Sequence, residues 1–136
     1  MSESKKISLP ISGSTSVEAN DSPENSEQGG DILSEIAKIN SDNPVVLYMK
    51  GTPDQPMCGF SAAASAVLSS YGKPYTAVNV LADPEIRQGI KVYGNWPTIP
   101  QLYVGGELMG GSDIVRQMHE SGELLEVIER ALAKVD

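Results

Sequence analysis

The chain contains 136 residues, 40% of them hydrophobic, which is enough for one domain of ordinary size with its own core. A net charge of −8 at pH 7 argues against binding of nucleic acid or of an anionic membrane through bulk electrostatics. No apolar run approaches the roughly 20 residues of a membrane span, and the single cysteine excludes an internal disulfide framework and fits a reducing compartment.

Residues 1–29 are predicted to form a disordered tail in front of a domain at residues 30–136. The segment is rich in serine, has no aromatic residue and carries more acids than lysines, so it has little with which to pack. It lacks the apolar stretch of a secretory signal, and without arginine it is a poor organellar transit peptide. A solvating tail without a specific role is the favoured interpretation, and a specific role is the alternative.

A first helix is expected to begin after Gly29-Gly30, with Asp31 as its N-cap. Its apolar positions recur at helical spacing, at Ile32, Ile36 and Ile39. Residues 41–44 end in Asn-Pro and are expected to stop the helix. The apolar run at residues 45–49 then predicts a short buried strand.

A second helix is predicted at residues 60–71. Its apolar side chains share one face, at Ala64, Val67, Leu68 and Tyr71. Gly72 and Pro74 are expected to close it. Residues 75–80 alternate well enough to form a second strand.

Asp83-Pro84 has the form of an N-cap followed by proline at the first helical position, which predicts a third helix. Gly94-Asn95 ends that helix. The apolar residues on its inner face are Ile86, Ile90 and Tyr93.

A hairpin is predicted next, with strands at residues 102–104 and 107–109 joined by the two-residue turn Gly105-Gly106. Residues 110–113 lead into a fourth helix, and the last helix follows Ser121-Gly122. The fourth helix contains the apolar residues Ile114, Val115 and Met118, and the last helix is expected to carry Leu124, Leu125, Ile128 and Leu132 toward the core. The whole order predicts one α/β domain of the thioredoxin-like type, in which about five helices flank a four-stranded mixed sheet.

Cys58 is the candidate reactive residue because it lies between the first strand and the second helix. Unpaired N–H groups and the dipole at a helix N-terminus favour a thiolate there, and Lys50 adds a positive charge. The glycine and prolines around Cys58 indicate a loop, which favours partial exposure over the alternative of a buried, inert thiol. Ser61 stands where a Cys-x-x-Cys motif would have its second sulfur.

Five motifs occur in the order Lys50-Gly-Thr-Pro with Pro56, Cys58-Gly59-Phe60-Ser61, Ile86-Arg87-Gln88, Trp96-Pro97-Thr98-Ile99-Pro100-Gln101, and Gly110-Gly111-Ser112-Asp113. Together they resemble the monothiol glutaredoxins of the Cys-Gly-Phe-Ser class. The resemblance covers residues 31–135 and implies the glutaredoxin variant of the thioredoxin-like fold. The predicted tail lies outside it.

The resemblance also implies a glutathione site. Lys50 and Arg87 would hold the glycine carboxylate of the tripeptide through charge-assisted hydrogen bonds. Lys91, one turn after Arg87, could share or replace its role. The alternative for these cations is that they are solvated surface charges.

The remaining implied contacts come from two other motifs. A cis bond before Pro100 would turn the backbone of Ile99 outward to pair with the cysteinyl backbone of glutathione, with Thr98 as a side-wall contact. Ser112 and Asp113 open a helix whose N–H groups suit the γ-glutamyl carboxylate, and Asp113 can accept from its amino group. An ordinary N-cap pair is the alternative. Many relatives have cysteine where this chain has Ser112, so a disulfide at that position is excluded.

Two reaction classes are open to a thiolate beside bound glutathione. The resemblance implies a labile [2Fe–2S] cluster, held by Cys58 from each of two protomers and by one glutathione sulfur on each, and passed to acceptor proteins. The alternative is glutathione-dependent thiol–disulfide exchange, or protein deglutathionylation, at which members of this class are generally poor. We rank cluster carriage first and leave enzymatic activity open. A plain interaction module would leave Lys50, Arg87 and Asp113 around Cys58 unexplained.

The implied partners are glutathione, a second protomer when a cluster is bound, apo iron–sulfur acceptor proteins and a BolA-like protein. Nucleic acid and membranes are not expected as partners. His119 is expected on a solvated helix face and not as a cluster ligand. The expected compartment is a bacterial-type cytoplasm, with the mitochondrial matrix as the alternative.

Overall fold

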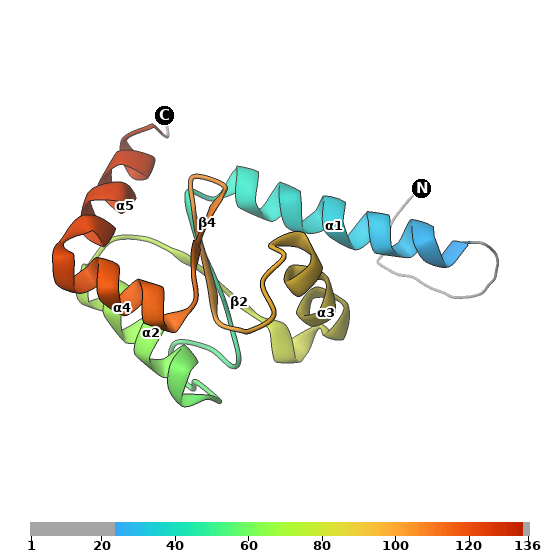
Figure 1. Cartoon of the computed structure of the whole chain (residues 1–136), viewed down its shortest axis with the longest axis horizontal. Helices are drawn as coiled ribbons and strands as arrows, with labels where there is room; N and C mark the ends of the chain where they lie inside the picture. Colours follow the sequence, from blue (N-terminus) through green and yellow to red (C-terminus); the bar gives the residue numbers. More distant parts are fainter. Residues whose placement is uncertain (1–23, 135–136) are drawn as a thin grey trace. The chain divides into compact units, whose positions relative to one another are not determined.

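The computed structural model describes residues 24–134. In chain order the elements are α1 (Glu24–Asp42), β1 (Val45–Met49), α2 (Gly59–Ser70), β2 (Thr76–Asn79), the 3-10 turn η1 (Val80–Ala82), α3 (Pro84–Tyr93), β3 (Gln101–Val104), β4 (Glu107–Gly110), α4 (Ser112–Ser121) and α5 (Glu123–Ala133) (Figure 1). The chain divides into two compact units, and the second, from Glu35 onward, contains the whole sheet. None of the described helices is long and apolar enough to cross a membrane.

The sheet has the strand order β2-β1-β3-β4. β1 and β2 run parallel, while β3 is antiparallel to both β1 and β4. A parallel pair needs a crossover, and α2 supplies it. The prediction of a βαβ unit followed by a hairpin, in a four-stranded mixed sheet, is therefore confirmed.

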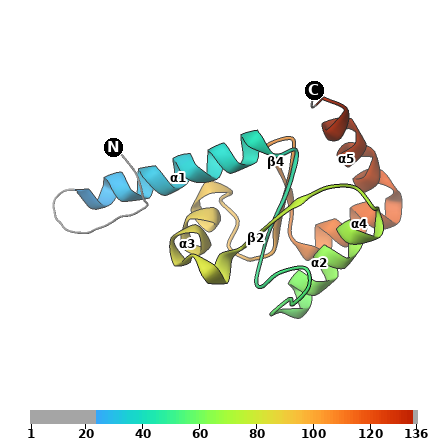
Figure 2. The ribbon, with the colours of Figure 1, turned by 180° about the vertical axis from the view of Figure 1, so that it is seen from behind.

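The core forms on both faces of β1, which is buried along its whole length. Alternate residues Val45, Leu47 and Met49 belong to one apolar cluster with buried residues of α2, α4 and α5. Figures 1 and 2 show these three helices together on one side of the sheet and α3 on the other. On the α3 side the Tyr48 and Tyr103 rings meet edge to face, with centroids 5.5 Å apart.

The predicted start of the first helix is wrong. α1 begins at Glu24 and runs through Gly29 and Gly30, so Asp31 lies inside the helix and does not cap it. Each glycine costs only about 1 kcal/mol relative to alanine, which weakens a helix without ending it. Residues 1–23 of the predicted tail lie outside the described residues, and the boundary at residues 29–30 stays a prediction.

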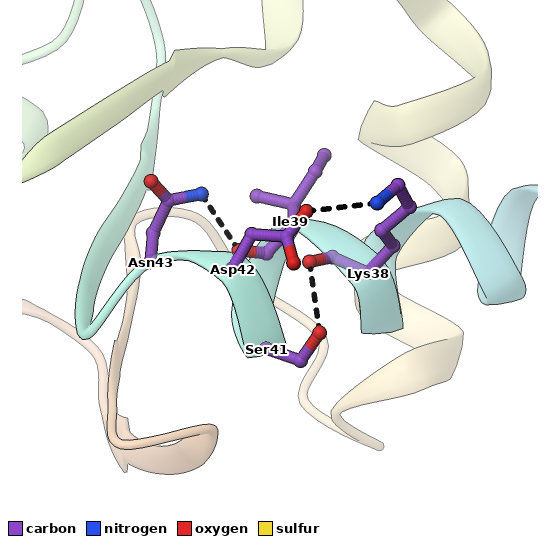
Figure 3. Close-up of polar contacts among 5 residues, drawn as sticks. All are labelled: Lys38, Ile39, Ser41, Asp42 and Asn43. Carbon is purple, nitrogen blue, oxygen red and sulfur yellow. Dashed lines mark hydrogen bonds and ion pairs between the residues drawn. The ribbon is translucent and has the colours of Figure 1, made fainter. Parts of the chain in front are cut away.

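The predicted end of that helix is confirmed, because α1 stops at Asp42. Figure 3 shows how side chains hold its last turn. Asn43 Nδ2 donates to the Ile39 carbonyl at 2.8 Å, and Ser41 Oγ donates to the Lys38 carbonyl at 3.1 Å. Ile39 is one of the last four residues of α1, whose carbonyls have no partner within an ideal helix, and the Asn43 amide supplies one.

Turn chemistry sets the other boundaries as predicted. Asp83 caps α3 by accepting from the N–H groups of Glu85 and Ile86. Gly105 and Gly106 both have positive φ, as a two-residue hairpin turn requires. One predicted core position was wrong: on α5, Leu124 and Ile128 are buried, but Leu125 is only half-buried and lies outside the main cluster. Leu132 packs against that cluster as predicted, together with Val127 and Ala131, which were not predicted.

Candidate functional site

Cys58 occupies the N-cap position of α2 as a free, partly exposed thiol. The loop before it is closed by a β-bridge between Gly51 and Pro56 and by a 2.9 Å bond from the Met57 N–H to the Lys50 carbonyl. Gly51 is needed there, because its φ is +91° and a Cβ would overlap the Gln55 carbonyl. The loop therefore fixes Cys58 at the junction of strand and helix, as the sequence predicts.

The environment of Cys58 lowers the pKa of its thiol. The largest cause is the backbone N–H of Ser61, which stabilises the thiolate, and partial burial of the sulfur opposes it. The Phe60 N–H, the Ser61 hydroxyl and the charge of Lys50 lower the pKa further, in that order. The expected effect of Lys50 is present, but the first turn of α2 contributes more.

Ser61 has a second role that sequence reasoning missed. Its side chain is fully buried, and its hydroxyl oxygen accepts a 3.0 Å hydrogen bond from the backbone N–H of Lys50. The bond joins the end of β1 to the first turn of α2. Ser61 thus fixes the distance between Lys50 and Cys58 as well as favouring the thiolate.

Beside this junction lies a cavity of about 410 Å³, here called the cationic cavity. Its lining residues are Lys50, Phe60, Lys91, Trp96–Pro100 and Gly111–Ile114. It brings together five of the predicted site residues from three separate motifs: Lys50, Thr98, Ile99, Ser112 and Asp113. Arg87 is not among the lining residues, whereas Lys91 is. The role assigned to Arg87 stays a prediction.

One end of the cationic cavity is the N-terminus of α4. Gly111 is the N-cap and makes no side-chain capping bond, so Ser112 and Asp113 present backbone N–H groups there. The Asp113 carboxylate lies 3.8 Å from Arg116 Nη2, and both side chains are largely exposed. Such a pair contributes little, so Asp113 can accept from a ligand.

The loop at residues 96–100 forms one wall. Its Ile99–Pro100 bond is cis, as the resemblance implies. Thr98 is exposed and Ile99 is buried. The Trp96 Nε1 atom is buried without a hydrogen-bond partner among the described residues, and a Cβ on Gly111 would lie 3.3 Å from it. Gly111 therefore lets the indole pack against the start of α4.

Cys58 itself lines a second hollow of about 550 Å³ between α2 and α4, here called the α2–α4 hollow. Apolar residues dominate its lining, among them Ala63, Val67 and Val115, with Arg116 beside them. Both hollows share Phe60, which is 65% exposed, together with Ser112 and Asp113. Cys58 lines the α2–α4 hollow and is not in the lining of the cationic cavity, so its thiol lies next to that cavity across these shared residues.

The described residues contain no group of three or more histidine, cysteine or acidic side chains that could hold a metal ion. His119 is exposed on α4, and its Nδ1 lies 2.6 Å from the Tyr71 hydroxyl of α2. A metal at Cys58 would therefore need ligands from outside the described residues of one chain.

Comparison with known sequences identifies a family. Residues 45–109 match the family model described as glutaredoxin. A monothiol glutaredoxin from Synechocystis is 52% identical over 98 residues, which cover 72% of this chain and 92% of the relative. Glutaredoxin 4 from Escherichia coli is 46% identical over 102 residues, covering 75% and 89%.

Solved structures agree with this assignment. The reduced apo GrxS14 of poplar has a TM-score of 0.65 at 44% identity, covering 74% of this chain and 93% of its own. A buckwheat glutaredoxin–glutathione complex has a TM-score of 0.69, covering 77% and 94%, and its 21% identity shows the fold alone. With 52% identity to a monothiol glutaredoxin over 98 residues and one cysteine in the Cys-Gly-Phe-Ser motif, the chain belongs to the glutaredoxin family, in its monothiol class.

Proposed function

We propose that the protein binds glutathione in the cationic cavity and, with it, carries a labile [2Fe–2S] cluster between two protomers. The observation behind this proposal is a partly exposed thiol of lowered pKa beside a cavity with lysines and a free helix N-terminus in its lining. Glutathione has a carboxylate at each end and a thiol in the middle. The cavity lining supplies lysines for one carboxylate and the N–H groups of α4 for the other, and the Cys58 thiol lies beside the cavity.

Each part of the tripeptide has a candidate partner. Lys50 and Lys91 line the cavity as cations for the glycine carboxylate, with Arg87 as the partner that the resemblance suggests. The N–H groups that open α4 suit the γ-glutamyl carboxylate, and Asp113 suits its amino group. Ile99 and Thr98 contribute the wall against which the cysteinyl residue lies. The buckwheat complex supports glutathione as the ligand of this fold.

The cluster follows from a count of thiolates. One chain supplies only the sulfur of Cys58, and its described residues provide no further metal-binding group. One glutathione sulfur per protomer brings two protomers to four thiolates, the ligand set of a [2Fe–2S] cluster. Because two of the four ligands are an exchangeable small molecule, the cluster is cargo that can be released to apo acceptor proteins. A BolA-like protein is a further partner suggested by the family, and the bacterial cytoplasm or the mitochondrial matrix is the compartment that we propose.

The test is anaerobic reconstitution of the full chain with iron, sulfide and glutathione. We expect a visible sulfur-to-iron charge-transfer band that elutes with a dimer, and we expect no band when glutathione is omitted. A cluster that forms equally well without glutathione would overturn the proposed ligand set.

The lowered pKa of Cys58 also favours a second function, the exchange of thiols with glutathionylated proteins. In this reaction the Cys58 thiolate attacks the glutathione sulfur and releases the protein thiol, and a second glutathione then resolves the mixed disulfide as glutathione disulfide. Colourless protein after reconstitution, with fast turnover of a glutathionylated substrate, would favour this function over cluster carriage.

A further inference from the structure

Behind the wall formed by residues 96–99 lies a buried polar side chain that the proposed function does not use. Gln101, the first residue of β3, is 0% exposed. Its Nε2 donates to the carbonyls of Trp96 and Thr98, at 3.0 and 3.2 Å, and its Oε1 accepts from the Tyr103 hydroxyl at 3.0 Å. Both amide donors are therefore in use, as a buried amide requires.

The bond to Thr98 sets the direction of the next peptide N–H. Only the Ile99–Pro100 bond is cis among the described residues, so the peptide that joins Thr98 to Ile99 is trans. In a trans peptide the C=O and the N–H point in opposite directions. With the Thr98 carbonyl held toward buried Gln101, the Ile99 N–H points away from it. No hydrogen bond among the described residues uses that N–H, and Ile99 lines the cationic cavity.

Gln101 is held from the side of α3. The Tyr103 ring, whose hydroxyl donates to Gln101, lies 5.5 Å from the Tyr48 ring and 5.8 Å from the Tyr93 ring, measured between centroids. Gly94, at the end of α3, leaves room for this hydroxyl, because a Cβ there would overlap it. These contacts hold the side-chain amide of Gln101 in place, and the amide in turn holds the carbonyls of Trp96 and Thr98.

We propose that Gln101 is a positioning residue for glutathione: by fixing the Thr98 carbonyl it aims the Ile99 N–H into the cationic cavity, where it donates to the cysteinyl backbone of the tripeptide. This inference rests on the proposed function, since it assumes that the cavity binds glutathione. It adds a buried residue that touches no ligand and acts through the loop.

The test compares three variants of the full chain in the reduced, cluster-free state. Gln101→Met keeps the length of the side chain and removes both donors. Tyr103→Phe keeps the donors but frees the amide to turn. Tyr48→Phe is the matched control, because it also removes one buried hydroxyl from a hydrogen bond, here with Asn40 Oδ1 at 2.7 Å, which no bond connects to the loop.

Titration of the ¹⁵N-labelled proteins with reduced glutathione gives the dissociation constant and the chemical shift of the Ile99 amide. We expect Gln101→Met to raise the dissociation constant about five- to tenfold, the effect of one or two lost hydrogen bonds. The downfield shift of the Ile99 amide on binding is expected to shrink with it. Tyr48→Phe is expected to lower the melting temperature and leave both readouts at the wild-type values, and alkylation of Cys58 is expected to be equally fast in all variants.

An unchanged dissociation constant in Gln101→Met would overturn the inference, as would an equal rise in Tyr48→Phe, which would indicate general loosening of the domain. If Gln101→Met does not fold, the dissociation constant of Tyr103→Phe is compared with that of Tyr48→Phe instead, and a rise in Tyr103→Phe alone supports the inference. Wild-type protein that binds no glutathione would instead overturn the proposed function itself. Binding in the wild type with no difference among the variants would leave that function standing and remove only the role of Gln101.

Discussion

The N-termini of α2 and α4 differ from that of α3 in how their first N–H groups are satisfied. α3 is closed by its own sequence, because the Asp83 carboxylate accepts from two of its N–H groups. α2 and α4 begin with Cys58 and Gly111, and neither makes a side-chain capping bond. Of these three ends, the two without a cap border the candidate site, whereas α5, whose N-cap Gly122 also makes no side-chain bond, contributes no residue to the lining of either hollow.

At α3 the helix N-terminus serves stability, and at α2 and α4 it faces the candidate site. A capped end has its donors satisfied within the chain and contributes to stability. An end without a cap leaves donors and a positive partial charge for another anion, which is the thiolate at α2 and, in our proposal, a carboxylate of glutathione at α4. Substitutions at the three ends are therefore expected to change different properties.

The largest effect is expected at the end of α2. Cys58→Ser is expected to abolish both cluster binding and thiol exchange, because serine supplies neither a thiolate ligand nor a thiol nucleophile. The melting temperature of the cluster-free protein is expected to stay close to wild type, since the side chain is partly exposed. Thermal melts measure the stability, and reconstitution measures cluster binding. A loss of more than about 3 kcal/mol, the scale of a core cavity, would show that Cys58 is structural.

The next effect is expected at the end of α4. Asp113→Ala is expected to weaken glutathione binding by about 1.5–3 kcal/mol, the range for hydrogen bonds to charged groups, and Lys50→Ala by a similar amount. Their effects need not add, because both act on one tripeptide. The measurement is the glutathione concentration at half-maximal cluster formation.

Arg116→Ala is the control for Asp113. It removes the cation 3.8 Å from the Asp113 carboxylate but leaves the carboxylate in place. Because this exposed pair is weak, the half-maximal glutathione concentration is expected to stay within about twofold of wild type. If Arg116→Ala weakens binding as much as Asp113→Ala, the arginine and not the carboxylate holds the ligand.

At the capped end of α3 a substitution is expected to lower stability and to leave glutathione binding unchanged. Asp83→Ala leaves two N–H groups without their acceptor and is expected to cost about 1 kcal/mol of unfolding free energy. The dependence of cluster formation on glutathione is expected to remain that of the wild type. Chemical denaturation measures the unfolding free energy, and reconstitution at a series of glutathione concentrations measures the dependence of cluster formation on glutathione. A change in glutathione dependence would mean that the cap also shapes the site.

The pH dependence of Cys58 gives a finer test of the α2 end. Only the thiolate is alkylated, so the rate rises with pH through the pKa of the folded protein, which lies below that of the unfolded chain. The thiolate therefore stabilises the folded state at pH values above the unfolded pKa, and this contribution is lost as the pH falls through the folded pKa.

Ser61→Ala removes the hydroxyl contribution and keeps that of the Ser61 N–H, which is the largest cause. We expect the midpoint of alkylation to move upward while staying below that of the urea-unfolded protein. A midpoint in Ser61→Ala equal to the unfolded value would show that the hydroxyl, and not the backbone, sets the pKa.

Much of the fold could be predicted because its boundaries are set by neighbouring residues. Asp83-Pro84 and Gly105-Gly106 determine a helix start and a hairpin turn through their own backbone preferences. The start of α1 could not be predicted in the same way, because a glycine pair only weakens a helix and Asp31 is a capping residue only where a helix begins.

The site was predictable where a motif lies in one stretch of chain, and less so where two elements meet. The motif residues Lys50, Ile99 and Asp113 come to one cavity. The bond from the Lys50 N–H to Ser61 depends on how β1 and α2 pack. The bonds of Gln101 lie within residues 96–103, but the Tyr103 ring that supports them is placed by Tyr48 and Tyr93 from other elements.

The smallest effect concerns the choice between two cations on α3. Arg87 and Lys91 are one turn apart, and only Lys91 lines the cationic cavity. We therefore expect Lys91→Ala to raise the glutathione dissociation constant several-fold, and Arg87→Ala to raise it about twofold or less, as for a screened surface charge. Titrations at low and at high salt separate direct contact from general attraction, because an effect carried only by long-range charge disappears with screening. A larger effect of Arg87→Ala at both salt concentrations would mean that its side chain reaches the ligand directly, and the glycine carboxylate would then be assigned to Arg87.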